Sequence, residues 1–227
     1  RGFCQRMRQK RPYTRSKIAM SLDGRTAMAS GESQWITGVE ARQDVQKLRA
    51  QSGAIVTGIG TVLADDPQMT VRPEQWYPEG QALRQPLKVV VDSQFKIASD
   101  ANILSTDGEV LIATTSHIQR EDIASIRLEA VQGHVDLTQL MANLAQRNIN
   151  DVLIEAGAIL NGAMLTAGLI DELVIYMAPK IMGDSAKGLL HLPALQTMAG
   201  CVDLTITDIR AVGGDWRITA IPHTPQH

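Results

Sequence analysis

A glycine turn between a short strand and a helix is the stretch of this chain that offers the most chemistry. Residues 152–154 are an apolar run of β-type side chains, and Glu155, Ala156 and Gly157 follow directly. From Ile159 onward the apolar residues recur with the spacing of one stripe of a helix. We therefore expect the free N–H groups and the positive dipole end of a helix at the carboxyl end of a strand, where they can bind phosphate, with Glu155 in the same crevice.

This junction alone leaves two interpretations open. Gly157 also suits a plain tight turn, because the stretch is neither a GxGxxG fingerprint nor a P-loop with Lys and Ser or Thr after the glycine. A second strand, residues 54–57, runs through Gly58 and Gly60 into a short helix that ends near Pro67. Two such junctions are expected to face one crevice of a parallel sheet, which is where ligands of open α/β sheets collect.

The order of the predicted elements indicates the class of fold. A helix is expected from Thr37, where Glu40 completes a capping box, and another after Asp136 or Thr138. The remaining expectations are a short helix over residues 118–126, loops over 25–35 and 73–86, and strands at 17–20, 54–57, 87–91, 110–113, 152–154, 173–176, 204–210 and 216–221. The sequence predicts one α/β domain: a mixed, mainly parallel sheet with helices on both faces and a C-terminal antiparallel hairpin.

Composition excludes several classes of protein. The chain has 227 residues, a formal net charge of −2 and 44% hydrophobic residues, so nothing indicates nucleic acid as a general partner. No apolar run is long enough to span a membrane, and the basic start lacks the apolar core of a secretory signal. Two cysteines, Cys4 and Cys201, and five scattered histidines favour a reducing, cytoplasmic location and no metal site.

Three blocks of sequence carry a resemblance to a known family. They read KIAMSLDGRTAMASGESQWIT (residues 17–37), AIVTGIGTVLADDPQMTVR (54–72) and LIEAGAILNGAMLTAGLIDELVIYMAPKIMG (153–183). Together they resemble the reductase domain of the bifunctional riboflavin-biosynthesis deaminase–reductase, which has a dihydrofolate-reductase-like fold. The resemblance implies NADPH-dependent reduction of the ribosyl group of 5-amino-6-(5-phosphoribosylamino)uracil to a ribityl chain. It also implies a reductase domain over residues 15–227 and, over residues 1–14, a linker or tail of a zinc deaminase domain.

The resemblance implies roles for individual residues. Lys17 matches a lysine near the reacting sugar, and Glu155 matches a residue at the ribose; these two are the expected catalytic residues. The matched substrate and phosphate contacts are Ser33, Arg49, Met69, Arg72 and Glu155. The matched NADPH contacts are Ala19, Trp35, Thr61, Asp65, Ser93, Gly157, Ala158, Ile159, Leu160, Asn161, Gly162 and Ala163. Ala158 departs from the proline or glycine frequent there, but its backbone N–H can still bind phosphate.

Alternatives remain at this stage. The proton donor is open, since Lys17 or a water can supply the hydrogen bond to the opened sugar and no histidine lies in a motif. The chain can also be an inactive module that scaffolds a deaminase or an oligomer, or a related enzyme that reduces a pterin. Two arginines and a serine suit a phosphate better than a flat pterin. Apolar strands near the carboxyl end, and the self-association of the resembled family, predict a homodimer.

Overall fold

The computed structural model describes residues 1–72 and 83–223, and the chain divides into two compact units. Unit 1 consists of Arg1–Tyr13 and Val45–Leu153, and unit 2 consists of Thr14–Asp44 and Ile154–His227. The chain therefore passes between the units after Tyr13, within a helix after Asp44, and after Leu153. Each unit has its own set of hydrogen-bonded strands.

Unit 1 is built on a parallel sheet with the strand order β9-β3-β4-β5-β6. The strands are β3 (Ala54–Gly58), β4 (Leu87–Val91), β5 (Val110–Thr114), β6 (Ser125–Arg127) and β9 (Asp151–Ile154). Their central residues, among them Val56, Val89 and Ile112, are fully buried. Continuous apolar strands of this kind are typical of a parallel sheet that is covered on both faces.

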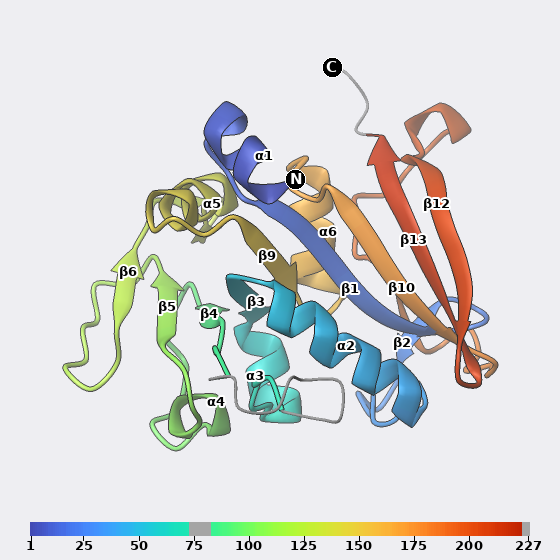
Figure 1. The fold of residues 1–227 in the computed structure, drawn as a ribbon, viewed down its shortest axis with the longest axis horizontal. Coiled ribbons are helices and arrows are strands. Elements are labelled where there is room, and N and C mark those ends of the chain that lie inside the picture. Colours follow the sequence, from blue (N-terminus) through green and yellow to red (C-terminus); the bar gives the residue numbers. More distant parts are fainter. Residues whose placement is uncertain (73–82, 224–227) are drawn as a thin grey trace. The chain divides into compact units, whose positions relative to one another are not determined.

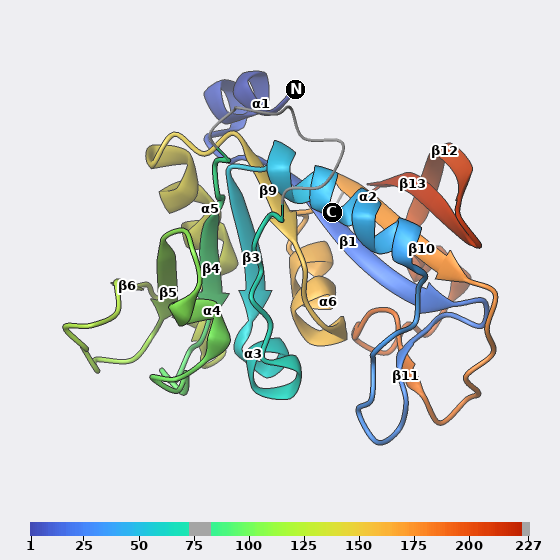
Figure 2. The ribbon, with the colours of Figure 1, turned by 60° about the horizontal axis from the view of Figure 1, so that its bottom comes forward.

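Short helices follow or flank these strands (Figures 1 and 2). They are α1 (Gly2–Gln9), the end of α2 (Val39–Gln51), α3 (Ile59–Asp65), α4 (Asn102–Ser105) and α5 (Leu137–Gln146), and a small ribbon is formed by β7 (Ala130–Val131) and β8 (His134–Val135). Asp136 caps α5, because its carboxylate accepts from the N–H groups of Thr138 and Gln139. This confirms the predicted helix and selects Asp136 as its cap.

Unit 2 is built on a mixed sheet with the strand order β12-β13-β10-β1. β1 (Tyr13–Ser21) pairs parallel with β10 (Glu172–Ala178), whereas β13 (Asp215–His223) is antiparallel to β10 and to β12 (Asp203–Val212). These strands lie side by side in Figure 1. The predicted mixed sheet with a C-terminal antiparallel hairpin is confirmed.

The two faces of this sheet are covered by different helices. Ser16 on one face donates from its hydroxyl to Asn161 of α6 (Ala158–Thr166) at 2.7 Å. Tyr176 on the opposite face donates to Asp44 of α2 at 2.7 Å. Register places Lys17 and Ala19 on the Tyr176 face, because Ala19 lies opposite Tyr176 and side chains alternate along a strand. The prediction of helices on both faces is therefore confirmed for this sheet.

Three local predictions differ from the structure. Residues 118–126 were expected to form a helix, but Ser125–Arg127 form strand β6 instead and pair with β5. The edge of a sheet has unpaired backbone N–H and C=O groups, and here they bind the backbone of these residues. The helix expected from Thr37 begins at Val39, since the N–H of Gly38 donates to Asp215 at 2.6 Å. Arg25–Ala27, expected to be loop, is strand β2 and pairs with β11 (Lys187–Gly188). Most of the predicted 73–86 loop lies outside the described residues.

Candidate active site

The N-terminus of α6 in unit 2 presents backbone donors without a side-chain cap. Gly157 is the N-cap residue, with φ −74° and ψ 177°, and no side chain caps the helix within the part of the chain that is described. A Cβ built on Gly157 meets no protein atom within 4 Å. The space beside Gly157 at the start of the helix is thus open to a ligand, and N–H groups of a first helical turn suit the pyrophosphate of a dinucleotide.

Asn161 braces this turn from inside the protein. Its side chain is 1% exposed, and its amide donates to the carbonyls of Ala156 at 2.7 Å and Gly157 at 3.2 Å. Its Oδ1 accepts from the Ser16 hydroxyl on β1. One buried amide therefore joins the strand to the glycine turn, and the conformation of the turn is set before any ligand binds.

Gly162 lies on the side of α6 that faces the protein. A Cβ at this position would overlap the backbone of His191, whose N–H also donates to the Ala158 carbonyl at 3.0 Å. The glycine thus permits close packing of a loop on the helix. The structure gives Asn161 and Gly162 positioning roles, and their direct contact with a cofactor stays a prediction. Ile159, by contrast, is 74% exposed.

Trp35 is an exposed aromatic residue that two cations contact, one at its ring and one at its backbone carbonyl. It is 63% exposed, and the Arg42 guanidinium lies 4.6 Å from the ring centroid. Arg42 also donates to the Thr37 carbonyl at 2.8 Å, and Lys180 donates to the Trp35 carbonyl at 2.7 Å. An indole fixed in this way offers a flat surface against which a ring can stack.

The other predicted residues of unit 2 lie on separate elements. Lys17 and Ala19 lie on β1, and Glu155 follows β9 with 8% of its surface exposed. Ser33 is part of the loop after Gly31, which has φ 97°. The catalytic roles of Lys17 and Glu155 stay predictions.

In unit 1, α2 holds the segment formed by residues 69–72. Arg49 donates to the Thr70 carbonyl at 2.9 Å and lies 3.8 Å from the Met69 sulfur. One turn earlier, Gln46 accepts from the Arg72 N–H at 3.0 Å. The structure thus brings Arg49, Met69 and Arg72 together, with the Arg72 side chain exposed to solvent.

The predicted cofactor contacts of unit 1 follow neighbouring parallel strands. Thr61 and Asp65 are four residues apart on α3 and so share one face of that helix. Ser93 follows β4; its hydroxyl accepts from the Val135 N–H, and its carbonyl accepts from the hydroxyls of Thr114 and Thr115. The carboxyl ends of β4 and β5 are therefore tied together at Ser93.

Sequence reasoning missed a polar cluster around the buried Tyr176, beside Ala19. The Asp44 carboxylate accepts from the Tyr176 hydroxyl and from Arg217 at 2.8 Å. Burial, and then the bond to Asp44, raise the pKa of Tyr176 far above its ordinary value. Only the strong apolar context of Tyr176 was visible in the sequence; its partners come from α2 and β13, and no local pattern indicates them.

Neither metal-binding clusters nor spanning helices are found in residues 1–72 and 83–223. No group of three or more His, Cys, Asp or Glu side chains there is arranged to hold a metal ion. None of the helices in these residues has the length and apolar character that crossing a membrane requires.

Comparison with known proteins identifies the family. The sequence profile of the RibD C-terminal domain matches residues 12–218. The chain belongs to this family. It is 47% identical over 225 residues to the riboflavin biosynthesis protein RibD of Escherichia coli K12, covering 95% of this chain and 61% of that protein. A structure of Acinetobacter baumannii RibD is similar with a TM-score of 0.88 and 39% identity, covering 98% of this chain and 61% of that one.

Relatives of two lengths match the chain. It spans between about half and three fifths of the length of the curated RibD proteins, 49% in the Chlamydia trachomatis protein and 61% in the Escherichia coli protein. A shorter relative from Buchnera aphidicola (Acyrthosiphon pisum), named 5-amino-6-(5-phosphoribosylamino)uracil reductase, is 35% identical, and the match covers 86% of this chain and 99% of that protein. A protein of about this length therefore exists as a separately named reductase.

Proposed function

We propose that this chain reduces the ribosyl group of 5-amino-6-(5-phosphoribosylamino)uracil to a ribityl chain, with NADPH as the hydride donor. The observation that carries the proposal is the N-terminus of α6, which has no side-chain cap and where the space beside Gly157 is open. Membership of the RibD C-terminal domain family and the name of the short Buchnera relative support the choice of substrate.

Several residues are assigned to the cofactor. NADPH supplies a hydride when it is bound. The N–H groups at the start of α6 hold its pyrophosphate, and the Trp35 indole offers a surface for one of its rings. Thr61, Asp65 and Ser93 are assigned to its remaining polar groups, as the family resemblance implies. Asn161 and Gly162 act indirectly, because they fix the glycine turn and the loop packed on α6.

The remaining site residues are assigned to the substrate. Arg49, which contacts the 69–72 segment, and Arg72, which belongs to it, bind its phosphate, since guanidinium groups match phosphate oxygens. Ser33 adds a hydroxyl, and Glu155 binds the ribose. Lys17 donates a hydrogen bond to the opened sugar, which makes the carbon that accepts the hydride more electrophilic.

Nicotinamide absorbance tests the proposal directly. The purified chain, mixed with NADPH and the phosphoribosylaminouracil, is expected to oxidise NADPH with formation of the ribityl product. Activity is expected to survive prolonged treatment with a chelator, because the proposed chemistry uses no metal. A folded chain that binds both compounds without turnover would support the inactive scaffold instead.

A homodimer is part of this proposal. One face of the β12–β13 hairpin carries the exposed side chains of Leu204, Ile206, Ile209 and Trp216, which are 45–55% exposed. A bulge between Ile206 and Asp208 shifts the register by one residue and so keeps Ile209 on the same face as Ile206. A contiguous apolar face on an edge hairpin is typical of a protein–protein interface.

Light scattering at micromolar concentration tests the dimer. The parent is expected to have the mass of two chains, and Ile206→Glu is expected to have the mass of one, because the charge would be buried in the interface. Thr205→Glu, on the opposite face of the same strand, serves as the control and should remain dimeric. A monomeric parent would refute this part of the proposal.

The RibD relatives are longer than this chain, which supports a second domain, a deaminase, in the natural protein. We assign residues 1–14 to the tail of a zinc deaminase domain and residues 15–227 to the reductase domain. Gly2–Gln9 form helix α1, whose Phe3 and Met7 are 59% and 51% exposed and one helical turn apart. The natural protein is expected to be cytoplasmic, and the reading frame upstream of Arg1 tests the assignment of the deaminase.

A further inference from the structure

A buried lysine of unit 1 holds the end of helix α4. Lys88 lies on β4 and is 1% exposed. Its ammonium group donates to the Ile103 carbonyl at 2.8 Å, to the Thr106 carbonyl at 3.0 Å and to the Thr106 hydroxyl at 2.9 Å. The Thr106 hydroxyl accepts the bond from Lys88, so its own proton is left to donate elsewhere.

Helix α4 bonds in turn to the segment that follows α3. The Thr106 hydroxyl donates to the Gln68 carbonyl at 3.3 Å. At the start of α4, the backbone N–H and the side-chain amide of Asn102 each donate to the Asp66 carboxylate at 2.8 Å. These contacts join positions that are 36 and 38 residues apart in the sequence. The α4 region therefore holds residues 66–68 by contacts that the local sequence of this segment does not provide.

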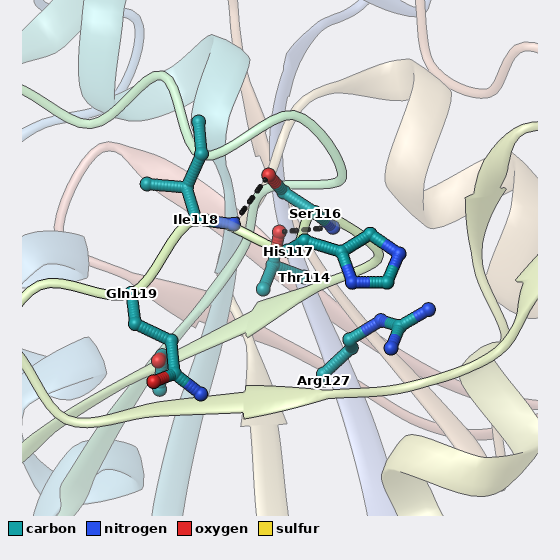
Figure 3. A pocket seen from close by; sticks show the side chains of 7 residues that line it. Thr114, Ser116, His117, Ile118, Gln119 and Arg127 are labelled. Carbon is teal, nitrogen blue, oxygen red and sulfur yellow. Dashed lines mark hydrogen bonds between the residues drawn. The ribbon is translucent and has the colours of Figure 1, made fainter.

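The polar side chains of the loop after β5 act over a shorter range. Figure 3 shows that the Thr114 hydroxyl accepts from the Ser116 N–H at 3.1 Å and that the Ser116 hydroxyl accepts from the Ile118 N–H at 3.1 Å. These bonds join residues only two positions apart and shape the loop itself. Asn102 and Thr106 instead bind a part of the chain that lies before β4, and so they can determine its conformation.

The segment that α4 holds leads directly to an arginine proposed to bind phosphate. Met69 has φ 53°, in the left-handed region that residues other than glycine rarely adopt, and it is 5% exposed. The α4 contacts hold residues 66–68 before Met69, and α2 holds Thr70 and Arg72 after it. Such a conformation persists only where the surrounding structure determines the path of the backbone. The contacts on both sides of Met69 thus set the direction in which the chain reaches Arg72.

We propose that Asn102 and Thr106 are positioning residues for the substrate, because they fix the backbone of residues 66–69 and thereby place Arg72 at the phosphate. The inference rests on the proposed function, since it concerns the same phosphate group. Both residues act through Arg72 and not by touching the substrate. The predicted cofactor contacts on α3 should not depend on them, because that helix ends before the segment.

Kinetics with two substrates test this role. Asn102→Ala is expected to lower kcat/KM for the phosphorylated substrate roughly threefold to tenfold, with an unchanged KM for NADPH. With a substrate that lacks the phosphate, Asn102→Ala should react like the parent, since Arg72 then has no phosphate to bind. Combined with Arg72→Ala, it should add no further loss. A merely structural role would instead lower the activity with both substrates and in both backgrounds.

Neighbouring substitutions on α4 supply the controls. Ser105→Ala removes an exposed hydroxyl that donates only within the helix, to the Asn102 carbonyl, and should react like the parent. Thr106→Val lacks the hydroxyl that binds Gln68 and should repeat the pattern of Asn102→Ala, whereas Thr106→Ser keeps a hydroxyl and should recover most of the loss. Equal losses with the two substrates, or the same loss in Ser105→Ala, would overturn the inference.

Hydrogen exchange decides the inference without requiring turnover. The N–H groups of Val71 and Arg72 each donate to a glutamine side chain, at 2.8 Å and 3.0 Å. They are expected to exchange faster in Asn102→Ala and in Thr106→Val than in the parent. Unchanged exchange in both variants would overturn the inference. If the parent reduces neither substrate, the proposed reductase activity fails, and the exchange rates still decide whether Asn102 and Thr106 hold the segment.

Discussion

Asp23 and Asp44 are two carboxylates of the same compact unit, and the protein holds them by different means. Asp23 lies in a turn, where it accepts from the neighbouring Ser21 hydroxyl and, across the fold, from the backbone N–H groups of Met182 at 3.1 Å and Gly183 at 2.8 Å. Asp44, on α2, accepts instead from a phenol and a guanidinium of the sheet. Backbone donors depend only on the path of the chain, whereas side-chain donors depend on two particular residues.

The same difference separates the two sites proposed for phosphate groups. The start of α6 offers backbone N–H groups next to Gly157, whereas α2 and the 69–72 segment offer the guanidinium groups of Arg49 and Arg72. A backbone site is expected to be sensitive to added bulk where the ligand passes, because its donors cannot be removed by substitution. A side-chain site is expected to be sensitive to truncation of the donor itself.

Truncation of the partly buried Asp44 carboxylate should give the largest effect. Asp44→Ala leaves the Arg217 guanidinium, whose side chain is 13% exposed, without its carboxylate. We expect a loss of about 3 kcal/mol in the free energy of unfolding, measured by urea denaturation. Tyr176→Phe keeps the ion pair and should cost only about 1 kcal/mol. Equal losses in the two variants would show that the charge of Asp44 is not what the cluster depends on.

The second largest effect is expected from a bulkier side chain at the backbone site. Gly157→Val is compatible with φ −74° and meets no protein atom, so the variant should fold. Its side chain occupies the space in front of the α6 N–H groups, and we expect roughly 100-fold weaker NADPH binding, measured by fluorescence titration. Gly214→Val in the hairpin turn, which also meets no neighbouring atom, is the control. If Gly157→Val binds NADPH as tightly as the parent, the pyrophosphate does not bind at this turn.

Truncation at the side-chain site should cost roughly tenfold to 100-fold in kcat/KM. Arg72→Ala removes a guanidinium from the proposed phosphate site, and kcat is expected to fall as well if binding of the phosphate orients the sugar. A substrate without the phosphate should lose the same contact, so the two changes should be non-additive. Kinetics of the four combinations measure this coupling, and simple addition of the two losses would exclude Arg72 as a phosphate ligand.

The smallest effect is expected at Asp23 and only in acid. Its pKa is lowered to about 2, first by the Ser21 hydroxyl and further by the N–H groups of Gly183 and Met182. Because folding lowers this pKa, the stabilisation is complete above about pH 4 and is lost as the pH falls through about 2. Asp23→Asn should therefore flatten the decline of the free energy of unfolding between these values. Asp100→Asn, at an exposed aspartate, should leave the decline as steep as in the parent.

Local patterns in the sequence were sufficient for most of the elements. The apolar run before Gly157 became β9, the helical stripe after it became α6, and Asp136 caps α5. Each of these outcomes depends on residues within a few positions of one another. The prediction of a helix over residues 118–126 was wrong because Ser125–Arg127 pair with β5, a strand whose position the local sequence does not indicate.

The sequence by itself determined the α/β class, the glycine junctions and the family, because these depend on short-range periodicity and on blocks of contiguous residues. Only the tertiary structure decided which side chains meet. Arg217 reaches Asp44 across 173 positions of sequence, and Ser16 reaches Asn161 across 145. These contacts follow from strand register and helix packing, so a shift of one residue in β1 or β13 would turn Ser16 or Arg217 to the other face of the sheet.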